Sequence, residues 1–138
     1  YFNELVSIID KPIPLREKIV EIIERDFKRL KEDPNLILFM ANELHRDGDN
    51  LFPEFLVYKN VLRSKLHEQM QAEIETGKMR DISLQCLMPL VMGNLHFMFV
   101  CKDLVKWMYD FSADEFDSFV EKHKQCVIEM VTGYLFEK

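Results

Sequence analysis

Histidine and cysteine are the residues of this sequence best suited to hold a metal or act as nucleophiles: His45, His67, His96, His123, Cys86, Cys101 and Cys126. None of the histidines follows a glutamate by three residues, the spacing of carboxylate-bridged di-iron bundles, and HEQMQ at His67 lacks the second histidine of a zinc-protease helix. The cysteines stand far apart in apolar surroundings, without metal or redox spacing. We therefore expect no metal and no cofactor, and interpret the cysteines as buried thiols of a cytoplasmic protein rather than as a disulfide.

Motifs of the common enzyme classes are also missing from the sequence. It has no glycine-rich phosphate loop and no G-x-S-x-G elbow. The acidic cluster Asp114–Asp117 follows Ser112 in S-A-D-E, a reciprocal capping box with Glu115, so these acids fit the first turn of a helix. We predict that the protein is not an enzyme. A small-molecule-modifying enzyme with scattered catalytic residues is the alternative.

The least polar stretch is CLMPLVMGNLHFMFVC, residues 86–101. It is shorter than the roughly 20 apolar residues of a membrane-spanning helix, and it contains Asn94 and His96, so we predict no membrane span. In a helix it is apolar on two opposite faces, with Pro89 expected to cause a kink. One face carries Met88, Met92, Leu95 and Phe99, and the other carries Cys86, Leu90, Gly93, Phe97 and Cys101.

A helix that is apolar on two opposite sides must bury both of them against other helices. It lies either at the centre of a large bundle or against a second subunit. Gly93 either permits close helix approach or is merely tolerated. We expect the methionine face to look toward Phe55, Tyr58 and Leu62, where flexible methionines can repack around apolar guests. His96, at its edge, either bonds to a neighbouring group or lines a pocket.

The composition favours a single all-α domain. The chain has 138 residues, of which 48% are hydrophobic and 30% charged, with only four glycines and five prolines. Its formal charge of -6 is interleaved, without the basic stripe that nucleic acid requires. We therefore expect no DNA binding by these residues themselves.

Apolar periodicity and caps predict an antiparallel helical bundle of about five to six helices. The third should be sandwiched between neighbours, because LILFMANEL is apolar almost all round, and the polar turn at residues 46–50 should end it. The expected helices cover residues 1–9, 14–30, 34–44, 53–76 and 112–136, and a further helix is capped by Asp81 or Ser83 and runs to about residue 106.

This pattern resembles the C-terminal ligand-binding and dimerisation domain of the TetR family of bacterial transcription regulators. The resemblance rests on PLREKIVEIIERDFKRLKEDPNLILFMANEL, with its Asp-Pro join between two helices, and on E-x-G-x-x-R-D at Glu75–Asp81. The glycine-containing apolar helix and the final amphipathic helix also fit. Residues 1–10 resemble the end of the helix that links a DNA-binding head to the regulatory domain, here 11–138.

The resemblance implies two sites. A small apolar or amphipathic effector would bind in a pocket that includes Phe39, Phe55, Tyr58, Leu62, Met88, Met92, His96 and Phe99. A homodimer would form through the last two long helices, with an interface that includes Leu90, Gly93, Phe97, Cys101, Phe119, Cys126, Met130 and Gly133.

The sequence thus predicts the regulatory domain of a TetR-like regulator that contacts DNA only through an N-terminal helix-turn-helix head not included in these residues. Effector binding would change DNA affinity by shifting the spacing of the two heads. The alternative is a stand-alone helical adaptor whose groove binds an amphipathic partner helix.

Overall fold

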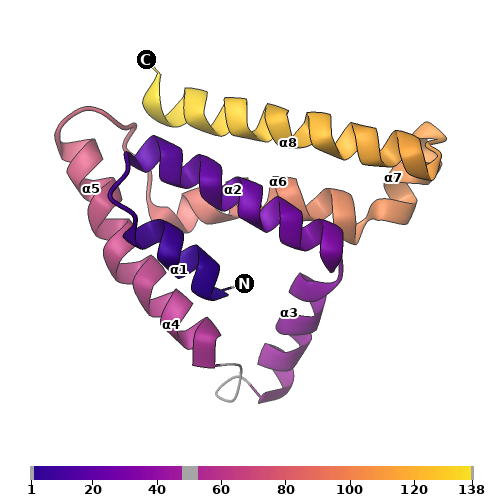
Figure 1. The fold of residues 1–138 in the computed structure, drawn as a ribbon, viewed down its shortest axis with the longest axis horizontal. Coiled ribbons are helices and arrows are strands. Elements are labelled where there is room, and N and C mark those ends of the chain that lie inside the picture. The colour runs from indigo at the N-terminus through magenta and orange to yellow at the C-terminus, as the bar shows by residue number, and fades with distance from the viewer. Residues whose placement is uncertain (1, 48–52, 138) are drawn as a thin grey trace.

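The computed structural model describes residues 2–47 and 53–137, which form helices and no strand, so the all-α prediction is confirmed (Figure 1). Most of the turn expected at residues 46–50 lies outside this range. The elements are α1 (Phe2–Asp10), α2 (Leu15–Glu32), α3 (Leu36–Asp47), α4 (Pro53–Val61), η2 (Leu62–Leu66), α5 (His67–Glu75), α6 (Leu84–Val100), α7 (Lys102–Tyr109) and α8 (Ala113–Phe136).

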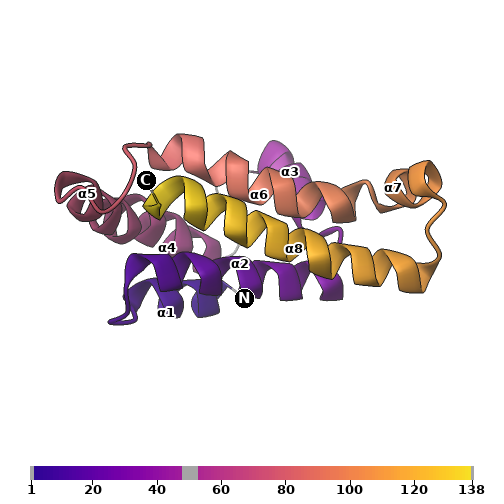
Figure 2. The ribbon, with the colours of Figure 1, turned by 90° about the horizontal axis from the view of Figure 1, so that it is seen from above.

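Helices α2, α6 and α8 form the main hydrophobic core. Figure 2 shows α8 running lengthwise beside α6 and α2. Phe99 of α6 lies at the centre, with its ring centroid 5.6 Å from Phe27 of α2 and 6.3 Å from Phe116 of α8, both in edge-on geometry. These aromatic contacts add to apolar burial and hold the three helices together.

The start of α8 follows the capping signal in the sequence. The backbone N–H of Glu115 donates to the Ser112 hydroxyl at 3.1 Å, and the Glu115 carboxylate accepts from the Ser112 backbone N–H at 3.1 Å. This reciprocal pair satisfies two N–H groups that a helix start leaves unpaired. Negative charge here also favours the helix dipole, which is consistent with the interpretation of the acidic cluster.

The E-x-G-x-x-R-D segment ends one helix and holds the end of another. Gly77 has a φ of 75°, the left-handed conformation that favours glycine, and terminates α5. Arg80 then donates from Nε to the carbonyl of Tyr134 at 2.8 Å and from its backbone N–H to that of Leu135 at 2.7 Å. Its guanidinium lies 4.3 Å from the centroid of the Tyr134 ring. The last carbonyls of α8 are therefore paired by a residue 54 positions away.

The apolar helix is shorter than predicted. It continues through Pro89 but ends at Val100 rather than near Lys106, and the chain turns at Cys101 into the separate helix α7. Within the described ranges no single helix is both long and apolar enough to cross a membrane. The pair α6 and α7 passes on combined length and composition, but it is bent by 72°.

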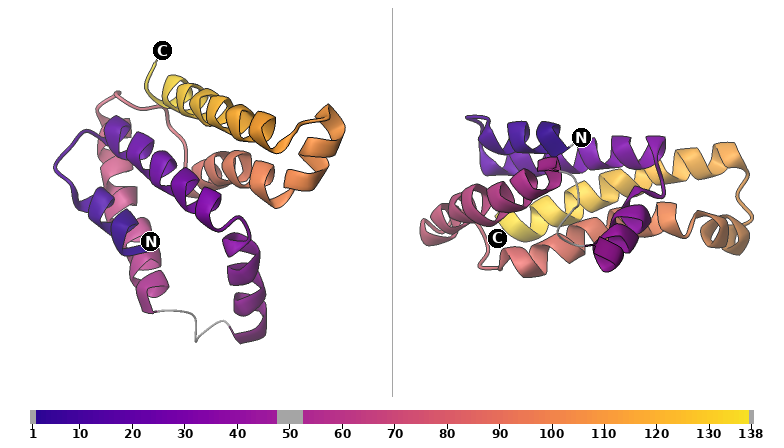
Figure 3. Two further views of the ribbon diagram at one scale, coloured as in Figure 1. Left: turned by 45° about the vertical axis from the view of Figure 1, so that its right-hand side comes forward. Right: turned by 90° about the horizontal axis from the view of Figure 1, so that it is seen from below.

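The prediction that the third helix is sandwiched between neighbours is wrong. Of its apolar residues Met40 is buried, whereas Leu38 is 45% exposed and Phe39 is 51% exposed. Figure 3 shows why: α3 extends away from α6 and α8, so only part of its surface meets other helices. An apolar composition indicated burial that the placement of the helix does not provide.

The interpretation of all three cysteines as buried thiols is also wrong. Cys86 and Cys126 are exposed and Cys101 is partly exposed, and none is in a disulfide. Cys86 and Cys126 lie on the outer sides of α6 and α8, which face away from the core that those helices share.

His123 makes stability depend on pH. Its Nε2 is buried and has no hydrogen-bond partner among the described residues, and its ring lies 6.0 Å from the Phe119 ring. Burial lowers the pKa of His123 below its ordinary value of 6.5, so the unfolded state binds this proton more tightly.

We expect the melting temperature to fall as pH drops below about 6.5, because acid then favours unfolding. His123→Leu should reduce this fall, whereas His67→Leu, at an exposed position, should not. Thermal unfolding followed by circular dichroism from pH 7.5 to 5 measures it. Equal pH slopes in wild type and His123→Leu would contradict the assignment.

Candidate ligand-binding cavity

A cavity of about 300 Å³ lies between α1, α2, α3, α4 and α6. Its lining is almost entirely apolar, with polar side chains from α2, α4 and α6, the pattern of small-molecule sites in proteins. The lining residues are Phe2, Leu5, Ile22, Asp26, Arg29, Leu30, Leu36, Ile37, Met40, Phe55, Tyr58, Met88, Met92, Gly93 and His96. Five of the predicted pocket residues are among them: Phe55, Tyr58, Met88, Met92 and His96.

Helix α6 presents three side chains to the cavity at successive turns. Met88, Met92 and His96 are spaced by four residues, so they stack along one side of the helix. The neighbouring side, including Val91 and Leu95, is buried in the core. The packing of α6 against α2 and α8 therefore sets the direction in which the cavity residues point.

Helix α1 closes the cavity on another side. The Phe2 ring lies 5.2 Å from that of Phe55 and 5.5 Å from that of Tyr58, between ring centroids. Leu5, one turn later, is 2% exposed and also lines the cavity. A molecule that fills the cavity would therefore contact α1.

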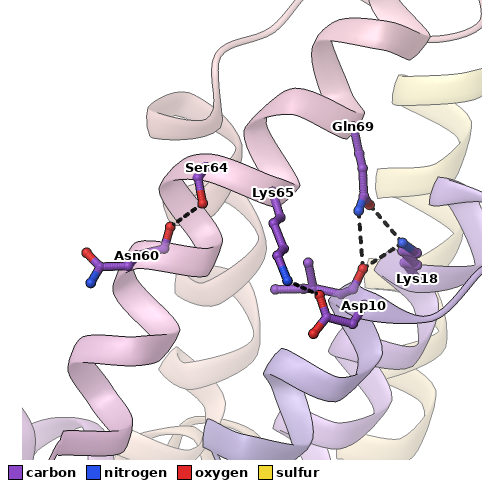
Figure 4. Close-up of polar contacts among 7 residues, drawn as sticks. Asp10, Lys18, Asn60, Ser64, Lys65 and Gln69 are labelled. Atoms are coloured by element: carbon purple, nitrogen blue, oxygen red, sulfur yellow. Dashed lines mark hydrogen bonds and ion pairs between the residues drawn. The ribbon is translucent and has the colours of Figure 1, made fainter.

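The C-terminal end of α1 is anchored by polar contacts, as Figure 4 shows. The buried Lys18 Nζ donates to the Ile9 carbonyl at 2.6 Å and to Gln69 Oε1 at 2.9 Å, and Gln69 Nε2 donates to the same carbonyl at 3.2 Å. Lys65 pairs with Asp10 at 2.7 Å. Burial lowers the pKa of Lys18, and the charge of Asp10 partly opposes this shift. These contacts position α1, and with it Phe2 and Leu5.

The main polar feature of the cavity wall joins α2 to α6. His96 Nε2 lies 2.7 Å from Asp26 Oδ2, and Asp26 is only 2% exposed. Because a carboxylate only accepts hydrogen bonds, the proton of this bond resides on Nε2. Burial, and to a lesser extent the negative charge of Asp26, raises the pKa of Tyr58 to about 12. Tyr58 therefore keeps its proton at neutral pH.

Three other predicted pocket residues do not line the cavity. Phe99 is 7% exposed and packs in the core between α2 and α8, because it lies one turn beyond His96 where α6 meets both helices. Leu62 packs against the core from η2. Phe39 lies on the exposed part of α3.

The predicted dimer-interface residues lie on the two long helices α6 and α8, apart from Cys101 at the turn after α6. Leu90 and Phe97 of α6 are 52% and 49% exposed, and Met130 of α8 is 58% exposed. A groove of about 320 Å³ runs between these helices, lined by Leu87, Leu90, Asn94, Met130, Val131, Tyr134 and Leu135. This chain therefore carries an uncovered apolar strip along α6 and α8.

The remaining five predicted interface residues differ in exposure and packing. Gly93 is exposed at the edge of the cavity, and an added Cβ there would meet no atom within 4 Å. Cys126 is exposed, while Cys101 and Gly133 are partly exposed. Phe119 packs within the chain, with its ring 5.2 Å from that of Phe111.

Sequence reasoning missed Asp26, Arg29 and Lys18, which shape the site. A signal was present for two of them. Lys18 and Asp26 fall within the apolar stripe of α2, four residues from Ile22 on either side, and a charged residue in such a stripe must find a partner. Their partners come from other helices, which no local pattern specifies.

The site holds no cluster suited to a metal: the described residues include no group of three His, Cys, Asp or Glu side chains that could bind one. Comparisons with protein-family models, with curated proteins and with solved structures find no match for this chain. The family resemblance therefore stays a prediction.

We predict strong energetic coupling between Asp26 and His96. His96→Leu removes a hydrogen bond from a buried carboxylate, whereas Asp26→Leu/His96→Leu removes both polar groups. The double variant should be more stable than the sum of the single losses implies, by about 1–3 kcal/mol. Urea unfolding of the four proteins at pH 7 measures this coupling, and additive single effects would contradict it.

Proposed function

We propose that this chain is the effector-binding and dimerising domain of a cytoplasmic, TetR-like transcription regulator. The observation that carries the proposal is the apolar cavity whose wall includes α1, the helix that by resemblance leads from a DNA-binding head. A small, mainly apolar effector would occupy it.

The cavity supplies a physical route from effector to head. Phe2 and Leu5 lie on its wall, whereas Ile9 and Asp10 at the other end of α1 are held by Lys18, Gln69 and Lys65. A ligand that contacts Phe2 and Leu5 would favour one position of α1 over another. An effector shifts an equilibrium only by such a difference in binding, and the effect on DNA affinity is reciprocal.

The exposed strip on α6 and α8 supports the dimer in this proposal. Three large apolar side chains on α6 and α8 remain about half exposed: Leu90, Phe97 and Met130. Contiguous apolar surface of this kind marks an interaction site. Pairing of the strip with its copy would bury it in a symmetric four-helix contact.

The same strip also supports a second candidate function, that of a helical adaptor. The groove between α6 and α8 would also suit the apolar side of an amphipathic helix from another protein, which is the adaptor function. The two candidates differ in solution: the regulator domain associates with itself and binds a small molecule, whereas the adaptor is a monomer that binds a helical peptide.

We predict that the two surfaces can be disabled separately. Using 1-octanol as a probe, the melting temperature of the wild type should rise with ligand concentration, because binding to the folded state stabilises it. Met92→Arg should abolish this rise by placing a cation among apolar groups. Ile37→Trp, from the more exposed α3, should weaken it by filling space without adding charge.

Met130→Arg is the matched variant on the other surface. It should convert a dimer into a monomer in sedimentation velocity at tens of micromolar protein while keeping the octanol response. Met92→Arg should remain a dimer and lose the octanol response. A wild type that is strictly monomeric would refute the dimer. An unchanged octanol response in both Met92→Arg and Ile37→Trp would refute the cavity as the site.

A further inference from the structure

The charged groups around the cavity restrict the ligands that it can hold. Four titratable side chains line it: Asp26, Arg29, Tyr58 and His96. A ligand charge would leave water for a largely apolar space, which is costly unless an opposite charge is available to pair with it. The charge class of the ligand therefore depends on what the existing charges already contact.

A cation finds Asp26 already engaged. This carboxylate is 2% exposed and accepts from His96 at 2.7 Å, so an ammonium group could reach it only by displacing the imidazole. The wall therefore disfavours a cationic head group.

An anion is disfavoured for a different reason. Arg29 Nη atoms lie 3.9 Å from a carboxylate oxygen of Glu32 and 3.8 Å from one of Asp33, so two acidic side chains already share its charge. An anionic ligand would also lie in a cavity that contains the negative Asp26. Attraction to Arg29 would be offset by repulsion from Asp26.

A neutral polar group meets neither obstacle. Tyr58 lines the cavity, and its hydroxyl keeps its proton at neutral pH and can donate to an oxygen atom. The imidazole of His96 also lines the cavity, and its Nε2 is already paired with Asp26. A ligand hydroxyl, which is uncharged and can accept from Tyr58, fits this part of the wall.

We propose that the effector is an uncharged, largely apolar molecule with a hydroxyl group at one end, and that Tyr58 binds this group. The proposal rests on the proposed function, since it names the ligand class of the same cavity. The apolar remainder would lie against Met88, Met92 and Phe55, where flexible methionine side chains can adapt to its shape.

The test compares three probes with one chain length and different head groups: 1-octanol, octanoate and octylammonium, titrated calorimetrically at pH 7. We expect 1-octanol to bind at least tenfold more tightly than either ion. Tyr58→Phe should weaken octanol binding by roughly threefold to tenfold, the range of one neutral hydrogen bond.

Each other outcome overturns a defined part of the proposal. Tightest binding of octylammonium or octanoate would refute the neutral class but leave the cavity as a ligand site. Equal octanol affinity in wild type and Tyr58→Phe would refute the role of Tyr58 alone. Failure of all three probes to bind would refute the proposed effector site itself.

Discussion

The hydrogen bond between His96 and Asp26 is the constraint on which the arrangement of this site depends. It joins helices that are 70 residues apart in sequence, at a carboxylate that is 2% exposed. A carboxylate buried so deeply must be paired, so the register of α6 against α2 is restricted to positions that bring His96 to Asp26. That register also directs Met92 and Met88, one and two turns earlier, into the cavity.

Apolar packing and polar pairing have different roles around this cavity. Burial of Phe27, Phe99 and Phe116 provides much of the driving force that joins α2, α6 and α8, but it is tolerant of small shifts. The contacts of Lys18 and Gln69 with the Ile9 carbonyl have stricter geometry, and they place α1. The cavity is thus surrounded by helices whose positions are set by directional contacts, while its lining consists of adaptable side chains.

Local features of the sequence predicted local structure well. The Ser112 cap and the helix end beside Gly77 each require only neighbouring residues, and the cap and a helix end near residue 76 were both predicted from the sequence. The helical face assigned to Met88 and Met92, with His96 at its edge, likewise identified three residues of the candidate site. Helical periodicity suffices where the question is which side chains share a face.

Features that depend on distant residues were not predictable in this way. The periodicity of α6 continues past Val100, so nothing local indicated the turn at Cys101. The composition of α3 suggested burial, but its exposure follows from where the other helices end. Phe99 and Met92 are both large apolar residues on the same predicted face of α6. Only the positions of α2 and α8 place Phe99 in the core and leave Met92 at the cavity. Sequence patterns identify faces, whereas the packing of helices decides what each face meets.

The central claim is that the space between α1, α2, α3, α4 and α6 binds a small apolar molecule. It is tested most directly by nuclear Overhauser effects between 1-octanol and the methyl groups of protein labelled with ¹³C-methyl methionine. Ligand in this cavity predicts cross-peaks to Met40, Met88 and Met92, which line it, and none to the exposed Met108 and Met130. Cross-peaks confined to Met108 or Met130, or no cross-peaks to any methionine at saturating octanol, would contradict the claim.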